Sequence, residues 1–118
     1  LRNGIPMSKT EFLPTTQRRL VAIHHEAEHD VVSIEAVAPW ADATASLVMR
    51  AVEEHAHDGT TIHVDLHSCQ TATVAQLACL ITALRSVRRS HASMYVTAPP
   101  CLRELASVCR LDGVLRWS

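Results

Sequence analysis

The sequence predicts an α/β fold, in which a mixed sheet of four or five strands is covered by three or four helices. Apolar runs of β-type residues alternate along the chain with segments whose apolar residues recur every three or four positions. Such alternation is typical of a sheet with helices packed on it. The length of 118 residues fits one domain, and the 47% hydrophobic content is enough to build an aliphatic core.

We expect residues 1–17 to form a flexible tail, because this stretch contains one glycine and two prolines and shows little periodicity. The domain is expected to span residues 18–118 and to open with two β-type runs, Arg19–His25 and Val31–Val37. The polar residues between these runs, 26–30, fit a hairpin turn.

The next segment is predicted to be a helix that runs from a cap at Asp42 or Thr44 to about His57. Its apolar residues have helical spacing, and Gly59 ends it in the manner of a glycine that follows a helix.

Residues 60–89 organise the chain. A buried strand, Thr61–Leu66, precedes a short polar loop and a long helix whose first turn can be capped by Thr71 or Thr73. The apolar stripe of this helix consists of Val74, Leu77, Leu80, Ile81, Leu84 and Val87. This order places the loop at the carboxyl end of the strand, where open α/β sheets usually bind their ligands.

The chain is expected to close with a strand, a helix and a short strand. Ser93–Ala98 is the predicted strand, and the prolines after it start a helix, since proline is tolerated in a first turn. Gly113 ends that helix, and Val114–Trp117 is predicted to return as a last short strand.

Composition and charge exclude several classes of protein. The net charge of −1 indicates neither a nucleic-acid partner nor an anionic membrane surface. No apolar run is long enough to cross a bilayer, and no signal peptide is found. The four cysteines form no C-x-x-C pair. The chain is therefore expected to be cytoplasmic, with reduced thiols and no direct membrane insertion.

His25, Glu26 and His29 match the zinc-protease signature H-E-x-x-H. That signature needs a helix, so that both histidines share one face, whereas the flanking residues here are β-type. We therefore expect these residues to lie in a hairpin. His63 and His67 would lie roughly 13 Å apart in an extended strand, which is too far for one ion. The sequence predicts no metal site and no cofactor.

Cys69 is the best-placed nucleophile, because a thiolate is favoured just before a helix N-terminus. The chain has only three glycines and contains no G-x-S-x-G, P-loop or G-x-G-x-x-G motif, so we expect no enzyme. A redox alternative remains, in which Cys69 or Cys79 bonds to Cys109. It requires the elements that carry these thiols to be adjacent.

Several segments together resemble a STAS domain, the family of the small bacterial anti-sigma factor antagonists. They are Val64-Asp65-Leu66, the helix after it with Leu77 and Leu80, and the closing segments Leu102–Leu105 and Leu111–Leu115. The resemblance runs from about residue 19 to residue 117. It implies a regulatory protein without catalytic activity that binds a kinase-like anti-sigma factor and so releases a sigma factor.

The resemblance also implies a partner-binding loop and helix start, formed by Ser68, Cys69, Gln70, Thr71, Thr73, Val74 and Gln76. In the family this place usually reads Asp-Ser-Ser-Gly, and a hydroxyl there is phosphorylated. Here the motif falls on residues 73–76, with Val74 and Ala75 in the hydroxyl positions. Thr71 and Thr73 are the hydroxyls close enough to substitute and are the candidate phosphorylation sites.

Two alternative functions stay open. A STAS subunit of a membrane transport system, such as an ABC lipid transporter or an anion transporter, would need the same fold and no phosphorylation site. A small enzyme or metal protein would instead use His25, Glu26 and His29, or Cys69.

Overall fold

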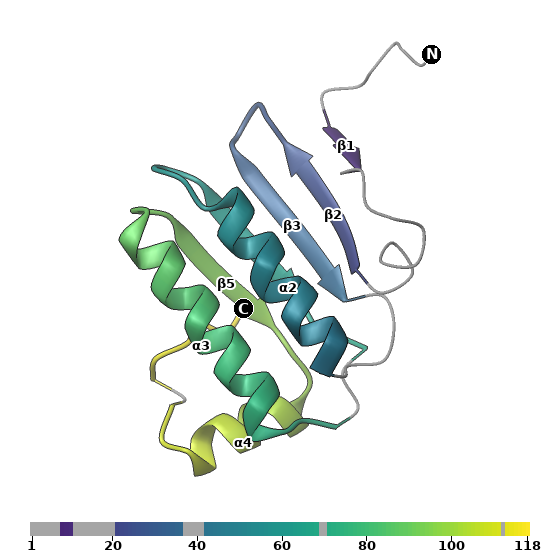
Figure 1. Ribbon diagram of the computed structural model, residues 1–118, viewed down its shortest axis with the longest axis vertical. Helices are drawn as coiled ribbons and strands as arrows, with labels where there is room; N and C mark the ends of the chain where they lie inside the picture. Colours follow the sequence, from purple (N-terminus) through teal and green to yellow (C-terminus); the bar gives the residue numbers. More distant parts are fainter. Residues whose placement is uncertain (1–7, 11–20, 37–41, 69–70, 112) are drawn as a thin grey trace.

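The computed structural model describes residues 8–10, 21–36, 42–68, 71–111 and 113–118, which form a five-stranded sheet with helices packed on it (Figure 1). The strands are β1 (Ser8–Thr10), β2 (Val21–Glu26), β3 (Val31–Ala36), β4 (Thr61–Asp65) and β5 (Ser93–Thr97). The helices of the described part are α2 (Asp42–His55), α3 (Val74–Arg89) and α4 (Pro100–Val108). The predicted α/β fold is therefore confirmed.

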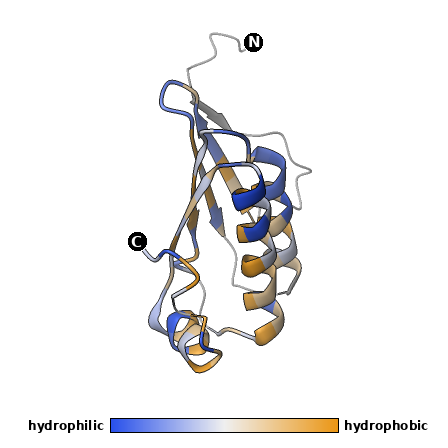
Figure 2. Ribbon diagram, turned by 90° about the vertical axis from the view of Figure 1, so that its left-hand side faces the viewer, coloured by the Kyte–Doolittle hydropathy of each residue, from blue (hydrophilic) through white to orange (hydrophobic). Residues whose placement is uncertain are grey.

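The strands lie in the sheet in the same order as in the chain. β1 and β3 both pair antiparallel with β2, whereas β3, β4 and β5 are parallel to one another. Parallel neighbours need a crossover, and α2 and α3 supply the two crossovers on the same face of the sheet (Figures 1 and 2). The carboxyl ends of β3, β4 and β5 consequently meet at one edge of the sheet.

Side chains alternate between the two faces of the central strands. Ile34 on β3 and Val64 on β4 are buried under the helices, whereas Ser33 and His63 are exposed on the other face. We call that second face, which α2 and α3 leave uncovered, the open face. The strand pattern thus separates an aliphatic core from a polar surface.

The core lies between the sheet and the two crossover helices. Figure 2 shows α2 and α3 together on one side of the sheet. The largest fully buried side chains are Ile34, Ile62, Leu66, Leu77, Leu80, Met94, Leu102, Val21, Val32, Val48, Val52 and Val64. Nearly all are aliphatic, as the composition predicts.

Two ends of the chain differ from the sequence-based expectation. Val114–Trp117 was predicted to be a strand, but this prediction is wrong, because only Trp117 makes an isolated parallel bridge to Val96. The peptide groups around Trp117 still bond to Val96, so the segment follows the edge strand without forming a ladder. Residues 8–10 lie in the expected tail and pair with β2, while the domain boundary itself stays a prediction.

In the described part of the chain, no helix combines the length and the apolar character needed to span a bilayer.

Replacing Ile34 with alanine tests the role of the core between β3 and the helices. Ile34 is fully buried, and its strand lies between β2 and β4. We expect Ile34→Ala to lower the free energy of unfolding by about 2–5 kcal/mol, because it removes buried methyl groups and leaves a cavity. Its control is Ser33→Ala, which faces the open side and should change the value by less than about 0.5 kcal/mol. Equal losses in urea unfolding would contradict the assignment of faces.

Candidate functional site

The predicted partner-binding segment lies where β4 ends and α3 begins. β4 ends at Asp65, Leu66 is fully buried, and α3 starts at Val74. The backbone N–H of Leu66 donates to the carbonyl oxygen of Thr97 at 2.7 Å, which extends the contact with the neighbouring chain beyond β4. α4 packs against α3, and Figure 1 shows it at the end of the molecule where α3 begins. The start of α3 therefore lies at the end of the molecule that α4 also occupies.

Thr73 caps α3 by a reciprocal pair of hydrogen bonds with Gln76. The Thr73 hydroxyl oxygen accepts a bond from the backbone N–H of Gln76 at 3.2 Å. The side-chain oxygen of Gln76 in turn accepts a bond from the backbone N–H of Thr73 at 3.1 Å. This arrangement is a capping box, which satisfies two backbone donors at the helix start. Of the two caps that the sequence allowed, Thr73 is the one used.

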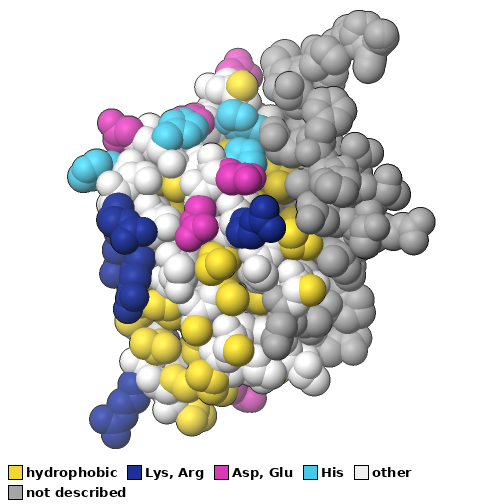
Figure 3. All heavy atoms as spheres, in the orientation of Figure 1, with side chains coloured by type: hydrophobic (Ala, Val, Ile, Leu, Met, Phe, Trp, Pro, Cys, Tyr) yellow, Lys and Arg dark blue, Asp and Glu magenta, His cyan; other side chains and the backbone are white. Residues whose placement is uncertain are grey.

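Val74 is the most exposed large apolar side chain of this segment, with 63% of its surface accessible to solvent. Ala75 and Ala78, which follow it on α3, are exposed as well, and so is Thr71 before the helix. We call Thr71, Thr73, Val74, Ala75 and Ala78 the helix-start surface. Figure 3 shows apolar side chains gathered over the lower part of the helical face. The first two turns of α3 thus present an uncharged surface.

The remaining predicted residues fall in different places. Ser68 is half-buried, whereas Cys69 and Gln70 lie outside the described residues. Gln76 is only 4% exposed and holds the capping box, so it supports the helix-start surface from beneath. Its burial was not visible in the sequence, where a glutamine near a helix start suggests a surface residue.

The cysteines do not form a disulfide in the described part of the chain. Cys79 on α3, Cys101 on α4 and Cys109 after α4 are each half-buried. All three pack at the margin of the core. The redox function of Cys79 and Cys109 stays a prediction, as does that of Cys69.

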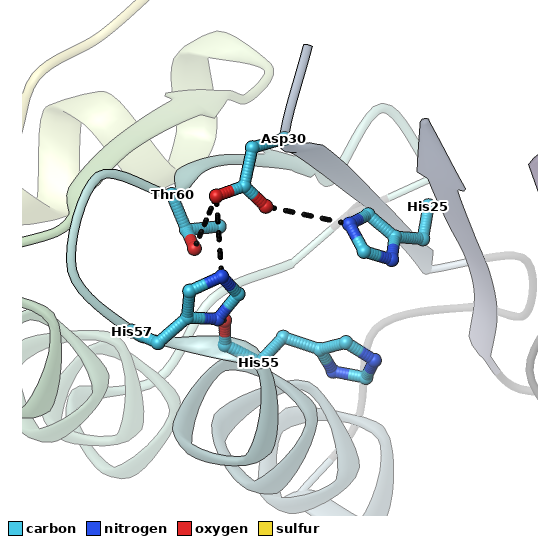
Figure 4. Close-up of polar contacts among 5 residues, drawn as sticks. All are labelled: His25, Asp30, His55, His57 and Thr60. Carbon is cyan, nitrogen blue, oxygen red and sulfur yellow. Dashed lines mark hydrogen bonds and ion pairs between the residues drawn. The ribbon is translucent and has the colours of Figure 1, made fainter. Parts of the chain in front are cut away.

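A second group of polar residues lies at the opposite end of the sheet, around Asp30 (Figure 4). The Asp30 carboxylate contacts Nε2 of His25 at 3.4 Å and Nε2 of His57 at 3.1 Å, and it accepts a bond from the Thr60 hydroxyl at 3.3 Å. The backbone carbonyl of Asp30 also accepts a bond from the N–H of Thr61. These contacts fasten the β2–β3 turn to the segment that leads into β4.

The H-E-x-x-H match has no helical geometry. His25 and Glu26 end β2, while His29 lies in the turn that follows. His29 contacts the carboxylate of Glu26 at 3.3 Å, and His25 contacts Asp30 instead. The two histidines therefore serve different carboxylates, and the hairpin expected from the flanking residues is confirmed.

The pKa of Asp30 is lowered from its ordinary value of 3.8. Partial desolvation alone would raise this pKa, but hydrogen bonds from His25, His57 and Thr60 and the nearby charge of His57 outweigh it. Because the folded state favours the ionised carboxylate, these contacts stabilise the fold above pH 3.8. That stabilisation is lost as the pH falls through the lower folded pKa.

A third group lies on the open face, near the carboxyl ends of β3 and β4. Nδ1 of His67 lies 3.1 Å from Oδ1 of Asp65, and Nε2 of His67 lies 3.6 Å from Oε2 of Glu35. The sequence does not predict this group, because Glu35 is thirty residues away from Asp65 along the chain. One signal was available: His63, Asp65 and His67 alternate, so strand geometry directs them to the same face.

The capping box predicts a specific loss of stability. We expect Thr73→Ala to lower the free energy of unfolding by about 1 kcal/mol, because the backbone N–H of Gln76 loses its acceptor. Thr73→Asp should keep most of the stability, since aspartate is also a good cap. Thr82→Ala is the matched control within α3, where the hydroxyl only bonds back to the carbonyl of Ala78. Urea unfolding measures all three variants, and a Thr73→Ala protein as stable as wild type would refute the cap.

The Asp30 cluster predicts a pH-dependent stability. Asp30 has a positive φ of 52°, which asparagine also tolerates, so Asp30→Asn removes the charge without a backbone penalty. We expect the stability difference between wild type and variant to shrink as the pH falls below 3.8, where the carboxylate becomes protonated. Asp58→Asn, a nearby exposed change, is the control. A difference that does not depend on pH, measured by urea unfolding, would show that the carboxylate charge has no role.

Comparison with known proteins reveals a similar fold but no similar sequence. The sequence matches no protein-family model and no curated protein. Its structure is similar to the crystal structure of an anti-sigma factor antagonist from Mycobacterium paratuberculosis, with a TM-score of 0.65, 82% of each chain covered and 15% sequence identity. At that identity the likeness lies in the arrangement of strands and helices. This chain therefore has the STAS-like fold that its sequence motifs indicated.

Proposed function

We propose that this chain is a regulatory protein-interaction module without catalytic activity, and that it binds an anti-sigma factor through the helix-start surface. The structural neighbour is an anti-sigma factor antagonist with the same fold. The single observation that carries the proposal is Val74, an apolar side chain 63% exposed on the first turn of α3. A partner that covers Val74 would remove this apolar side chain from water, which favours association.

The capping box makes the helix-start surface suitable for binding. The reciprocal bonds between Thr73 and Gln76 hold the first turn of α3 in one conformation before any partner arrives. A surface that is already ordered loses little conformational entropy on association, so more of the contact energy appears as affinity. The partner would then face Val74 and the two exposed alanines, which are too small to obstruct a close approach.

Regulation by phosphate would differ from the family pattern. Val74 and Ala75 occupy the usual hydroxyl positions, so we propose that only Thr71 and Thr73 could carry phosphate near this surface. A phosphate on Thr73 would meet the positive end of α3, which favours a negative charge. It would also bring that charge next to Val74, where it opposes apolar contact. Without modification, binding would be constitutive or set by thiol chemistry or abundance.

The same surface could serve a second kind of partner, the permease or ATPase of a membrane transport system. The observation that favours this alternative is again the pair Val74 and Ala75, because such a subunit needs no phosphorylation site. The two functions differ in the partner that is bound and share the fold and the surface.

Introducing a charge at position 74 tests the proposed function. We expect Val74→Glu to weaken binding of an anti-sigma factor at least tenfold, about 1.4 kcal/mol, because an apolar contact becomes a buried charge. A glutamate in the first turn suits the helix dipole, so the fold itself should be preserved. Binding of purified proteins is measured by titration calorimetry, with anti-sigma factors from the organism that encodes this chain.

Val108→Glu is the matched control. Val108 is 79% exposed on α4 and lies outside the helix-start surface, so the same substitution should leave affinity unchanged. Displacement of sigma factor from a preformed sigma–anti-sigma complex then tests the regulatory role directly. Equal weakening by both variants, or no binding below about 0.1 mM, would contradict the proposal. Binding to a transporter subunit in place of every anti-sigma factor would support the alternative.

A further inference from the structure

The cluster of Glu35, Asp65 and His67 follows from the pairing of two parallel strands. Glu35 on β3 is the direct neighbour of Asp65 on β4, and both side chains belong to the set that alternates onto the open face. His67 comes two residues after Asp65, so it returns to the same side. Three side chains with metal-binding atoms thus meet at one edge of the sheet.

The binding atoms of this cluster already lie close together. One ligand atom from each of the three residues can be chosen so that all lie within 4.8 Å of one another. In a first-row metal site with bonds of about 2.1 Å, adjacent ligand atoms lie about 3.0–3.5 Å apart. The side chains are about half exposed, so modest rotations can close the remaining gap. The two carboxylates stand on neighbouring strands, where the strand register pairs Glu35 with Asp65.

Electrostatics also favours a cation at this place. Within the described residues, the ion-pair contacts of Glu35 and Asp65 are both with the single imidazole of His67. Two neighbouring carboxylates therefore share one partner, and a divalent ion would relieve the repulsion between them. The backbone N–H of His67 donates to Oδ1 of Asp65 at 3.0 Å, which orients that carboxylate as outer contacts orient metal ligands.

The mixture of ligands selects the kind of metal. We propose that Glu35, Asp65 and His67 bind one divalent first-row transition-metal ion such as Zn²⁺. One imidazole nitrogen with two carboxylates suits such ions better than Mg²⁺ or Ca²⁺, which prefer oxygen alone. Both carboxylates line a groove that Ser33, His63 and Thr97 also border, and its space lets water complete the coordination. His67 supplies the nitrogen, because its imidazole contacts both carboxylates.

The histidines at the opposite end of the sheet are the alternative metal ligands, and their geometry fits less well. His25 and His57 contact different oxygens of Asp30, which keeps the carboxylate between the two rings. Among the residues that the structure describes, Glu35, Asp65 and His67 are the one group of three whose ligand atoms converge within 4.8 Å. The two ends of the sheet can therefore be distinguished by substitution.

Titration calorimetry of the tag-free protein with ZnCl₂ tests this site. We expect one equivalent to bind with a dissociation constant below about 0.1 mM. Glu35→Gln and His67→Gln should each weaken binding at least tenfold, as loss of a metal ligand does. The double variant His25→Gln/His57→Gln is the control and should bind as wild type does. Circular dichroism verifies that each variant is folded, and visible absorption of the Co²⁺-loaded protein reports loss of the imidazole ligand in His67→Gln.

Three outcomes would overturn this inference. Wild-type protein with no Zn²⁺ binding below about 0.1 mM would exclude the site. Binding that the double variant abolishes and Glu35→Gln leaves intact would move it to the Asp30 end of the sheet. A Co²⁺ spectrum unchanged by His67→Gln would exclude the proposed ligands. None of these results depends on the anti-sigma factor, so the metal site and the proposed function can fail separately.

Discussion

The parallel pairing of β3 with β4 is the constraint on which the rest of the structure depends. Its register places Ile34 beside Val64 in the core and Glu35 beside Asp65 on the open face. A slip of one residue would exchange the two faces of one strand and bury its carboxylate, so hydrophobic burial holds the register strongly. The same pairing brings the strand ends to one edge. The loop after β4, the start of α3 and the Glu35–Asp65–His67 cluster all owe their positions to it.

The start of α3 combines structural and functional roles in very few residues. The hydroxyl oxygen of Thr73 accepts a hydrogen bond in the first turn, and the buried side chain of Gln76 completes the capping box. Val74, between them in the chain, is left exposed. A helix start that is fixed from beneath can carry an exposed apolar side chain without local collapse over it. The same first turn of α3 is therefore stabilised by the capping box and presents the exposed Val74 to a partner.

The two ends of the sheet have different physical characters. Around Asp30, two histidines and a hydroxyl group contact one carboxylate. These contacts connect elements that are far apart in the chain, so the role of this end is structural. Near Asp65, two carboxylates converge on one imidazole, which leaves negative charge partly unbalanced. The first arrangement is satisfied by its own residues, whereas the second has capacity for a ligand. The helix-start surface adds an uncharged region at this second end.

The sequence by itself determined most of the elements and their faces. Helical and strand periodicities depend only on neighbouring residues, which is why β4, α3 and the hairpin around Glu26 could be predicted, together with a cap at Thr71 or Thr73. The tertiary structure decided which distant residues meet: Glu35 with Asp65, Asp30 with His57, and Trp117 with Val96 in a single bridge. It also decided that Gln76 is buried while Val74 is exposed. These outcomes depend on strand register and on helix packing over the sheet, which arise from the summed burial of many side chains and leave no local pattern in the sequence.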